Sequence, residues 1–252
     1  MNTRRATRPR TAGPSRAASG LALLLAVALP ARAGGLRPWD DGSSATPAPP
    51  WHVAGLPLQT KPFTRFDIVE LEGRRVLRVQ ADRSYGSLVQ RLPPGEDGRY
   101  LRWRWRVDIP NEHTDLRRRS GDDTAAELCV MFDLPLQALS LLDRQLVRVA
   151  RQHSPELLPT AAVCYVWDSR IPPGTVLDNA FTRRIRMIVL RGAGVPPGTW
   201  HAEQRDVRAD FLQLFADEAS EMPPIIGIGI GADADNTQTH TLSYISDLTL
   251  AP

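Results

Sequence analysis

The stretch LRWRWRV at residues 101–107 alternates apolar and basic side chains without interruption. Successive side chains of a β-strand point to opposite faces of its sheet, so one face carries the two tryptophans and the other carries the arginines. Tryptophans two residues apart form either part of a packed core or a flat platform for a sugar ring. Because Leu101 and Val107 share the tryptophan face, we expect a core there and predict that Arg104 points to solvent or to a ligand.

Short runs of similar character recur along the chain between turn residues, and they define a fold class. Runs typical of strands occupy residues 66–71, 75–81, 87–92, 100–107, 125–132, 161–167, 184–190, 200–207, 225–230 and 242–250. Two other stretches, 135–153 and 209–215, carry apolar residues at helical spacing. This pattern predicts a mainly β fold, an antiparallel two-sheet β-sandwich of the jelly-roll type with one or two inserted helices.

The first 33 residues have the composition of an export signal. They begin with arginines and no acidic residue, continue with the apolar run LALLLAVAL at 21–29, and end on Ala31-Arg32-Ala33. This order is typical of a cleavable signal peptide, and the run is shorter than the roughly 20 residues that span a bilayer. We therefore predict an exported protein of the periplasm or the extracellular space, with no transmembrane anchor in its mature form.

The rest of the chain divides into two parts by composition. Residues 34–62 are rich in proline, glycine and serine, which predicts an extended lead-in. Residues 63–252 contain the strand-like runs and have the length of one ordinary domain, so we predict a single β-sandwich domain there.

Removal of the predicted signal peptide reverses the sign of the net charge. The chain has 31 basic against 28 acidic residues, a formal net charge of +3. Six of the arginines and none of the acidic residues lie in 1–33, which leaves 25 basic against 28 acidic residues and a net charge of −3. A nucleic-acid partner is therefore not expected, because the apparent basic character belongs to the leader.

Cys129 and Cys164 are the two cysteines of the chain, and each lies in a strand-like run. An exported protein can oxidise its cysteines, and two of them allow one pairing. Buried free thiols fit the same positions, and the distance between the two strands decides between these alternatives.

Six segments, taken in order, resemble one bacterial family. They are LRWRWRV at 101–107, GDD at 121–123, YVW at 165–167, WHAEQRDV at 200–207, DADNT at 233–237 and YISD at 244–247. Together they resemble the domain of unknown function family 3047, from about residue 63 to residue 250. The resemblance implies an exported, sandwich-like domain and supplies no activity. The chain departs from the family pattern at Ser246, where we expect glycine, and at Gly231-Ala232, where we expect bulkier residues.

The segment DADNT at 233–237 is the most polar cluster, and it follows a strand that is expected to be buried. Alternate aspartates can present several hard oxygens to Ca²⁺, which takes six to eight such ligands. Asp233, Asp235 and Asp247 are therefore candidate ligands of a structural calcium ion. An Asx-turn, in which these side chains cap their own backbone, explains the same residues, and the two interpretations are compatible.

Several further polar residues are candidates for ligand binding. They are Arg104, Asp122, Asp123, Glu203, Arg205, Asp235 and Asn236. We expect Asp122 or Asp123 to pair with Arg104 across neighbouring strands. Glu203 with Asp122 or Asp235 could supply the two carboxyl groups of a glycosidase, whereas cross-strand pairing of Glu203 with an arginine gives it a structural role.

No catalytic signature accompanies these residues. The sequence contains no G-x-S-x-G, H-E-x-x-H or Walker motif, and its five histidines show no ligand spacing, which weighs against an enzyme without excluding one. We favour a non-enzymatic binding module for a glycan or another polar envelope ligand. The alternatives are an envelope hydrolase or lyase that acts on a polysaccharide with paired carboxylates, and a structural envelope protein without a small ligand.

Overall fold

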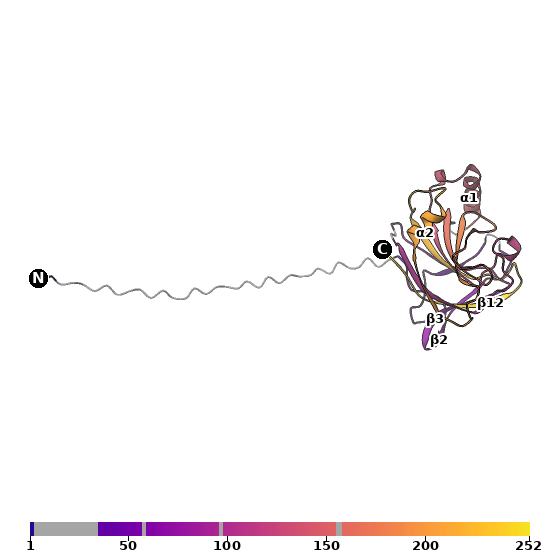
Figure 1. Ribbon diagram of the computed structural model, residues 1–252, viewed down its shortest axis with the longest axis horizontal. Helices are drawn as coiled ribbons and strands as arrows, with labels where there is room; N and C mark the ends of the chain where they lie inside the picture. The colour runs from indigo at the N-terminus through magenta and orange to yellow at the C-terminus, as the bar shows by residue number, and fades with distance from the viewer. Residues whose placement is uncertain (3–34, 57–58, 96–97, 155–157) are drawn as a thin grey trace. The chain divides into compact units, whose positions relative to one another are not determined.

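The computed structural model describes residues 1–2, 35–56, 59–95, 98–154 and 158–252 (Figure 1). The predicted signal peptide falls almost wholly outside the described residues. None of the described helices is long and apolar enough to cross a membrane.

Two β-sheets form the domain, as the alternating runs predict. The seven-stranded sheet has the order β1 (His52–Ala54), β4 (Ser87–Arg91), β11 (Ile225–Gly231), β6 (Ala126–Phe132), β7 (Ala161–Asp168), β9 (Ile185–Gly192), β8 (Val176–Asp178). The five-stranded sheet has the order β10 (His201–Asp206), β5 (Tyr100–Ile109), β12 (His240–Ala251), β3 (Arg74–Asp82), β2 (Arg65–Leu71). The neighbouring strands among the described residues are antiparallel, except that β7 and β9 are parallel. The predicted mainly β sandwich is confirmed, and β1 and β8 are short additions to it.

Aromatic side chains fill the space between the two sheets. Trp103 of β5 lies 5.3 Å from Tyr165 of β7 and Trp105 lies 5.5 Å from Trp167, measured between ring centroids. All four side chains are buried. The prediction that the tryptophan face of 101–107 belongs to the core is confirmed, and the basic face points outward.

The lead-in differs from its prediction, because part of it joins the domain. Trp39 and Trp51 are buried against each other with their rings 5.9 Å apart, and Trp51 Nε1 donates to the carbonyl of Arg37 at 2.7 Å. Residues 52–54 then form β1 on the edge of the seven-stranded sheet. Two large apolar side chains between prolines gain enough burial to order the segment.

Two helices interrupt the series of strands. α1 (Leu141–His153) lies between β6 and β7, and α2 (Val207–Leu214) follows β10. The predicted helix over 135–153 is shorter in the structure, because 136–138 form a separate 3₁₀ turn and the Ser140 hydroxyl then caps the new helix by accepting from Asp143 N at 3.1 Å. α2 packs Phe211 against Phe132 of β6 at 4.7 Å.

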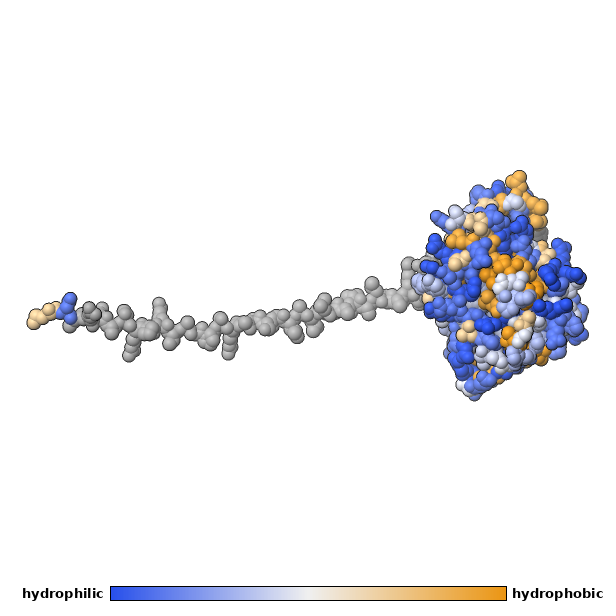
Figure 2. Space-filling view, in the orientation of Figure 1, coloured by the Kyte–Doolittle hydropathy of each residue, from blue (hydrophilic) through white to orange (hydrophobic). Residues whose placement is uncertain are grey.

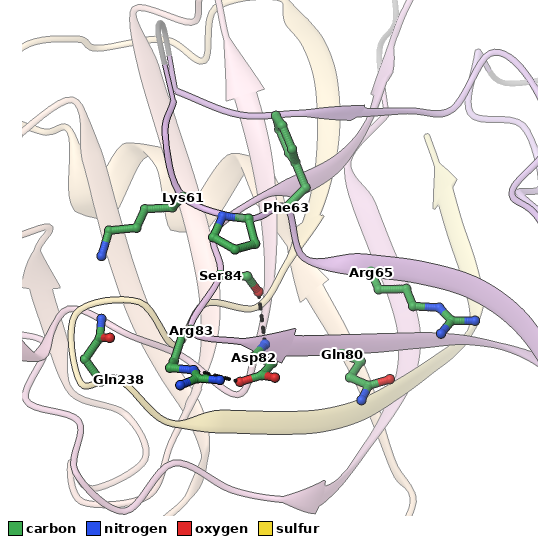
Figure 3. Close-up of a pocket in the computed structure, with 9 residues that line it drawn as sticks. Lys61, Phe63, Arg65, Gln80, Asp82, Arg83, Ser84 and Gln238 are labelled. Carbon is green, nitrogen blue, oxygen red and sulfur yellow. Dashed lines mark hydrogen bonds and ion pairs between the residues drawn. The ribbon is translucent and has the colours of Figure 1, made fainter.

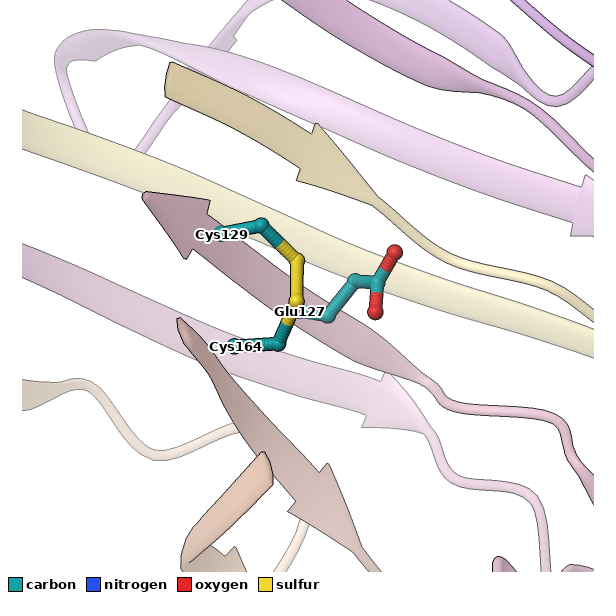
Figure 4. Close-up of side chains that lie close together, drawn as sticks. All are labelled: Glu127, Cys129 and Cys164. Carbon is teal, nitrogen blue, oxygen red and sulfur yellow. A yellow bond between two sulfur atoms is a disulfide. The ribbon is translucent and has the colours of Figure 1, made fainter. Parts of the chain in front are cut away.

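Cys129 of β6 and Cys164 of β7 face each other in the antiparallel register, and a disulfide joins them (Figure 4). Their side chains lie on the outer side of the seven-stranded sheet, since the alternate residues Leu128 and Val130 belong to the core. Of the two alternatives that the sequence left open, the structure contains the disulfide.

The stability of the domain is expected to depend on the aromatic core. Trp105→Ala should lower the free energy of unfolding by about 3–5 kcal/mol, because a large cavity remains between the sheets. Denaturant unfolding measures this loss. Phe181→Ala, at a ring that is 52% exposed, is the control and should change it by less than about 0.5 kcal/mol. Equal effects of the two substitutions would contradict the proposed role of the core.

Candidate functional site

The outer side of the five-stranded sheet is a polar surface made mainly of arginines and their acidic partners. Arg78 Nη2 lies 2.6 Å from Asp67 Oδ2 across β2 and β3, and Arg106 Nε lies 2.6 Å from Asp108 Oδ1 on β5. We call this surface the arginine face and define it by Arg65, Arg78, Arg102, Arg104 and Arg106. Most of these arginines are paired with carboxylates, so the net charge of the surface is small. The guanidinium groups still provide many hydrogen-bond donors for a polar ligand.

A shallow hollow of about 560 Å³ lies at one end of the arginine face (Figure 3). We call it the Lys61 groove, and its lining residues are Lys61, Pro62, Phe63, Arg65, Gln80, Asp82, Arg83, Ser84 and Gln238. They come from the segment before β2, from β2 and β3, and from the residues next to the ends of β3 and β12. Segments far apart in the sequence therefore build the groove together.

The Lys61 groove combines an exposed aromatic ring with cations and amides. Phe63 is 54% exposed. Arg83 Nε lies 3.2 Å from Asp82 Oδ1, whereas Lys61 Nζ is 3.9 Å from Asp235 Oδ2, so the ammonium is only loosely paired. The mixture of one apolar surface with several donors suits a ligand that has both apolar faces and polar edges.

Backbone strain is concentrated in the hollows of this face. The described residues other than glycine with positive φ are Glu72, Arg83, Gln238 and Asp247. Arg83 and Gln238 line the Lys61 groove, and Asp247 lines a second hollow. Such conformations cost energy and are found preferentially at functional sites, where the surrounding structure enforces them.

The second hollow, of about 370 Å³, lies between β5, β10 and β12. Arg104 borders it, with its guanidinium 5.4 Å from the centre of the Trp200 ring and 3.9 Å from Asp247 Oδ2. The expected pairing of Arg104 with Asp122 or Asp123 is therefore wrong. Asp122 instead accepts from Asn179 Nδ2 at 2.6 Å.

Five carboxyl groups gather beside the Lys61 groove, and we call them the acidic cluster: Asp122, Asp123, Glu127, Asp233 and Asp235. Oxygens of Asp123, Asp233 and Asp235 lie within 4.8 Å of one another. The loop 232–239 connects the cluster to the groove, since Ala234 N donates to Ser84 O at 3.0 Å. The groove and the acidic cluster thus share one loop.

Hydrogen bonds between two loops hold the acidic cluster in place. Asp123 accepts from Thr237 N at 2.7 Å and from Asn236 N at 3.1 Å, while Asp233 accepts from Thr124 N at 2.5 Å. Each of these two aspartates therefore caps the backbone of the other loop. The sequence suggested an Asx-turn, in which such side chains cap their own backbone, whereas the bonds of Asp123 and Asp233 join the two loops to each other.

Burial raises the pKa of four carboxyl groups of the acidic cluster, those of Asp122, Glu127, Asp233 and Asp235. Desolvation raises the pKa of Asp122 to about 6 and the pKa of Glu127 to about 7, and neighbouring carboxylates add to both shifts. Burial, followed by the charges of Glu127 and Asp123, also raises the pKa of Asp233. Glu127 fits there because Gly231 lies opposite it, and a Cβ at Gly231 would approach Glu127 Oε1 to 2.5 Å.

The donor set suits a hard cation. Carboxylate oxygens are the ligands that Ca²⁺ prefers, and the pKa of Asp233 is raised first by burial and then by the negative charges of Glu127 and Asp123. Asp233 accepts both of its bonds from Thr124 on Oδ1, so lone pairs of its Oδ2 remain for an ion, whereas each oxygen of Asp123 already accepts two hydrogen bonds from Asn236 and Thr237. Asp123, Asp233 and Asp235 are the residues that would hold such an ion.

The third predicted ligand, Asp247, does not join this group. A bulge in β12 between Ser246 and Thr249 places Asp247 at φ 57°, and its carboxylate lies 3.0 Å from Arg74 Nη2. The departure from the family pattern at Ser246 is next to this bulge.

Glu203 and Arg205 also lie apart from the acidic cluster. Glu203 is opposite Trp103 in the register of β10 and β5, so its side chain follows the tryptophan toward the core. There it accepts from Trp105 Nε1 at 3.1 Å and from Arg191 Nε at 2.7 Å. Arg205 pairs with Asp210 of α2. Among the described residues, the structure thus unites Asp122, Asp123, Asp233, Asp235 and Asn236, and it separates Arg104, Glu203, Arg205 and Asp247 from them.

Sequence reasoning missed the Lys61 groove. Its members carry no motif, and Lys61 and Phe63 lie at the boundary between the predicted lead-in and the domain. One signal was available, because Lys61 is the single lysine in a chain whose other bases are arginines.

Comparisons with known proteins place the chain in a family. The family model described as "Protein of unknown function (DUF3047)" matches residues 49–249. No curated protein matches the chain. Among 13 similar chains of solved structure is a cellulose induced protein, Cip1, with 12% sequence identity, 80% of this chain and 90% of that chain covered, and a TM-score of 0.31. A similarity at this level carries no information about ligand or activity.

The raised pKa of Glu127 predicts a pH dependence of stability. A carboxyl group whose pKa is higher in the folded state stabilises the fold below its unfolded pKa of 4.5, and this contribution disappears as the pH rises through about 7. With chelator present, the free energy of unfolding should therefore decrease as the pH rises from 4.5 to about 7. Glu127→Gln should remove part of that fall, on the order of 1–3 kcal/mol.

Denaturant unfolding at a series of pH values measures this effect. Glu70→Gln is the matched control, because Glu70 lies exposed on β2. Parallel pH profiles of the wild type and Glu127→Gln would rule out the raised pKa.

Proposed function

We propose that this chain, which belongs to the protein family of unknown function DUF3047, is a binding module for a glycan or another polar ligand. The ligand site is the Lys61 groove. The observation that carries this proposal is the hollow at the end of a polar sheet face, which the half-exposed Phe63 lines together with cations and amides.

The chemistry of the groove matches that of a sugar. The ring of Phe63, which points away from Gln80 and Gln238 (Figure 3), can cover the apolar face of a pyranose at the rim of the groove, while the two glutamines offer amide donors and acceptors to hydroxyl groups of the glycan inside it. Each groove cation lies near a carboxylate: Arg65 Nη2 is 3.0 Å from Asp67 Oδ2, Arg83 Nε is 3.2 Å from Asp82 Oδ1, and Lys61 Nζ is 3.9 Å from Asp235 Oδ2. The pair of Lys61 is the longest of the three, so its ammonium can take up a carboxylate of the ligand, which favours an acidic glycan.

The geometry lends less support to a hydrolase or lyase. Two carboxyl groups must face one glycosidic bond at a defined separation. The carboxylate of Glu203 accepts hydrogen bonds from Trp105 and Arg191, and Glu203 borders the second hollow rather than the Lys61 groove. Asp82 is the groove carboxylate, and Arg83 pairs with it. We therefore propose binding without catalysis.

We further propose that the module acts outside the cytoplasm, in the periplasm or the extracellular space. The composition of residues 1–33 supports this location. A structural calcium ion on Asp123, Asp233 and Asp235 is part of the same proposal, and their convergence within 4.8 Å supports it.

A glycan-array screen with the full chain tests the function. We expect hits among acidic glycans. Phe63→Ala should weaken binding to such a hit at least tenfold, about 1.4 kcal/mol, without lowering the melting temperature. Phe181→Ala removes a ring of similar exposure, 52% against 54%, at a place outside the groove, and it should bind like the wild type. An absence of hits, or equal affinity of the two variants for a hit, would contradict the proposal, and an absence of hits favours the structural-protein alternative.

Thermal unfolding with calcium or with chelator tests the ion separately. Calcium should raise the melting temperature, because a ligand that binds only the folded state stabilises it. Asp235→Asn should reduce this rise, whereas Asp133→Asn, at an exposed aspartate on a distant loop, should retain it. An identical melting temperature in calcium and in chelator would exclude a tightly held ion and leave the glycan proposal intact.

A further inference from the structure

The helix α1 turns its apolar side away from the domain. Leu141, Leu142 and Leu146 are 78%, 70% and 58% exposed, whereas Val147, on the other side of the helix, is 8% exposed. A surface helix of a globular protein normally buries its apolar stripe against the core. The amphipathic pattern predicted for this segment is present, but its orientation is the reverse of the usual one.

Arginines attach the opposite side of α1 to the domain. Arg144 donates from Nε to the carbonyl of Leu136 at 3.0 Å and from Nη2 to the carbonyl of Gln137 at 3.1 Å. Arg151 donates from Nε to the carbonyl of Leu158 at 3.1 Å, and its Nη2 lies 3.1 Å from Asp133 Oδ1. These bonds fix the rotation of the helix about its axis, so the exposure of the leucines is built into the fold.

The leucines form a small patch at one extremity of the domain. Figure 1 shows α1 at the outer end of the domain, and Figure 2 shows hydrophobic surface at the same corner. A stable dimer interface buries about 1,200–2,000 Å². A helix of 13 residues is about 20 Å long and presents far less apolar surface than that. A second copy of the chain is therefore a poor occupant.

The charges of α1 suit an anionic surface. The helix contains three arginines and one acidic residue, Asp143; since Arg144 and Arg151 bond to the domain on the opposite side, Arg148 is the arginine that remains on the exposed side. Arg148 is exposed and lies on the flank of the leucine patch. Successive residues of an α-helix are rotated by about 100°, so Arg148 projects in nearly the same direction as Leu141, two turns earlier. A helix with an apolar side and a cationic flank lies in the interface of a bilayer and prefers anionic lipids.

We propose that α1 binds the surface of an anionic lipid bilayer, with Leu141, Leu142 and Leu146 inserted among the acyl chains and Arg148 against the lipid phosphates. This membrane contact is independent of the ligand in the Lys61 groove. It would hold the domain on a membrane while the groove remains a separate site.

Hydrogen–deuterium exchange of the full chain with lipid vesicles tests this proposal at the helix itself. Vesicles of phosphatidylglycerol and phosphatidylcholine should slow the exchange of amides in 141–153, and vesicles of phosphatidylcholine alone should not. The readout is local to α1, so any lipid affinity of residues 1–33 does not produce it.

Variants define the contact. Leu142→Ser with Leu146→Ser should abolish the protection, and Arg148→Gln should weaken it several-fold, with the wild-type protection falling as salt is added. Phe181→Ser, at another exposed apolar residue, should leave it unchanged, and all variants should keep the wild-type melting temperature because these side chains are exposed. Unchanged exchange of 141–153 with anionic vesicles would overturn the proposal. So would concentration-dependent dimerisation that the double serine variant abolishes.

Discussion

The contact of two tryptophans on β5 with Tyr165 and Trp167 on β7 is the constraint on which the rest of the structure depends. These rings fill the space between the sheets and fix which side of β5 faces inward. Since side chains alternate along a strand, the arginines of the same segment must point outward. The pairing of β10 with β5 extends this rule, so Glu203 and Arg205 turn inward with the tryptophans, where Arg191 and Asp210 compensate their charges. The polar outer face is thus a consequence of the aromatic core.

The two loops at the end of the sandwich connect the acidic cluster to the Lys61 groove. Asp123 and Asp233 each cap the loop that carries the other, and the loop 232–239 also contributes Gln238 to the Lys61 groove. Any event that changes the charge of the acidic cluster, such as proton uptake or cation binding, therefore acts on a wall of the groove. The loose ion pair of Lys61 with Asp235 is the point where the two sites meet.

Alternation of side chains predicted strands such as β5 and β6, where burial on one face imposes a period of two, whereas β7 and β11 are buried on both faces and were recognised from continuous apolar runs. It could not locate β1 and β8, whose three residues are too short for a pattern. It could also not decide the disulfide, which depends on Cys129 and Cys164 facing each other in the register of two strands. The sequence listed Asp122, Asp123, Asp235 and Asn236 as binding candidates but grouped them with Arg104 and Glu203, which the structure separates from them. It did not identify the Lys61 groove, which unites Lys61, Gln80 and Gln238 only through tertiary packing. Helical spacing likewise identified α1 but said nothing about which side faces the domain.

The central claim is that the Lys61 groove binds the ligand, and the single lysine offers a direct measurement of it. Reductive methylation with ¹³C labels the amino group of Lys61, and its NMR signal can be separated from that of the N-terminus by titration with pH. Addition of an acidic glycan that binds the protein should shift the Lys61 signal in step with saturation. A glycan that saturates the protein while the Lys61 signal stays unchanged would contradict the account.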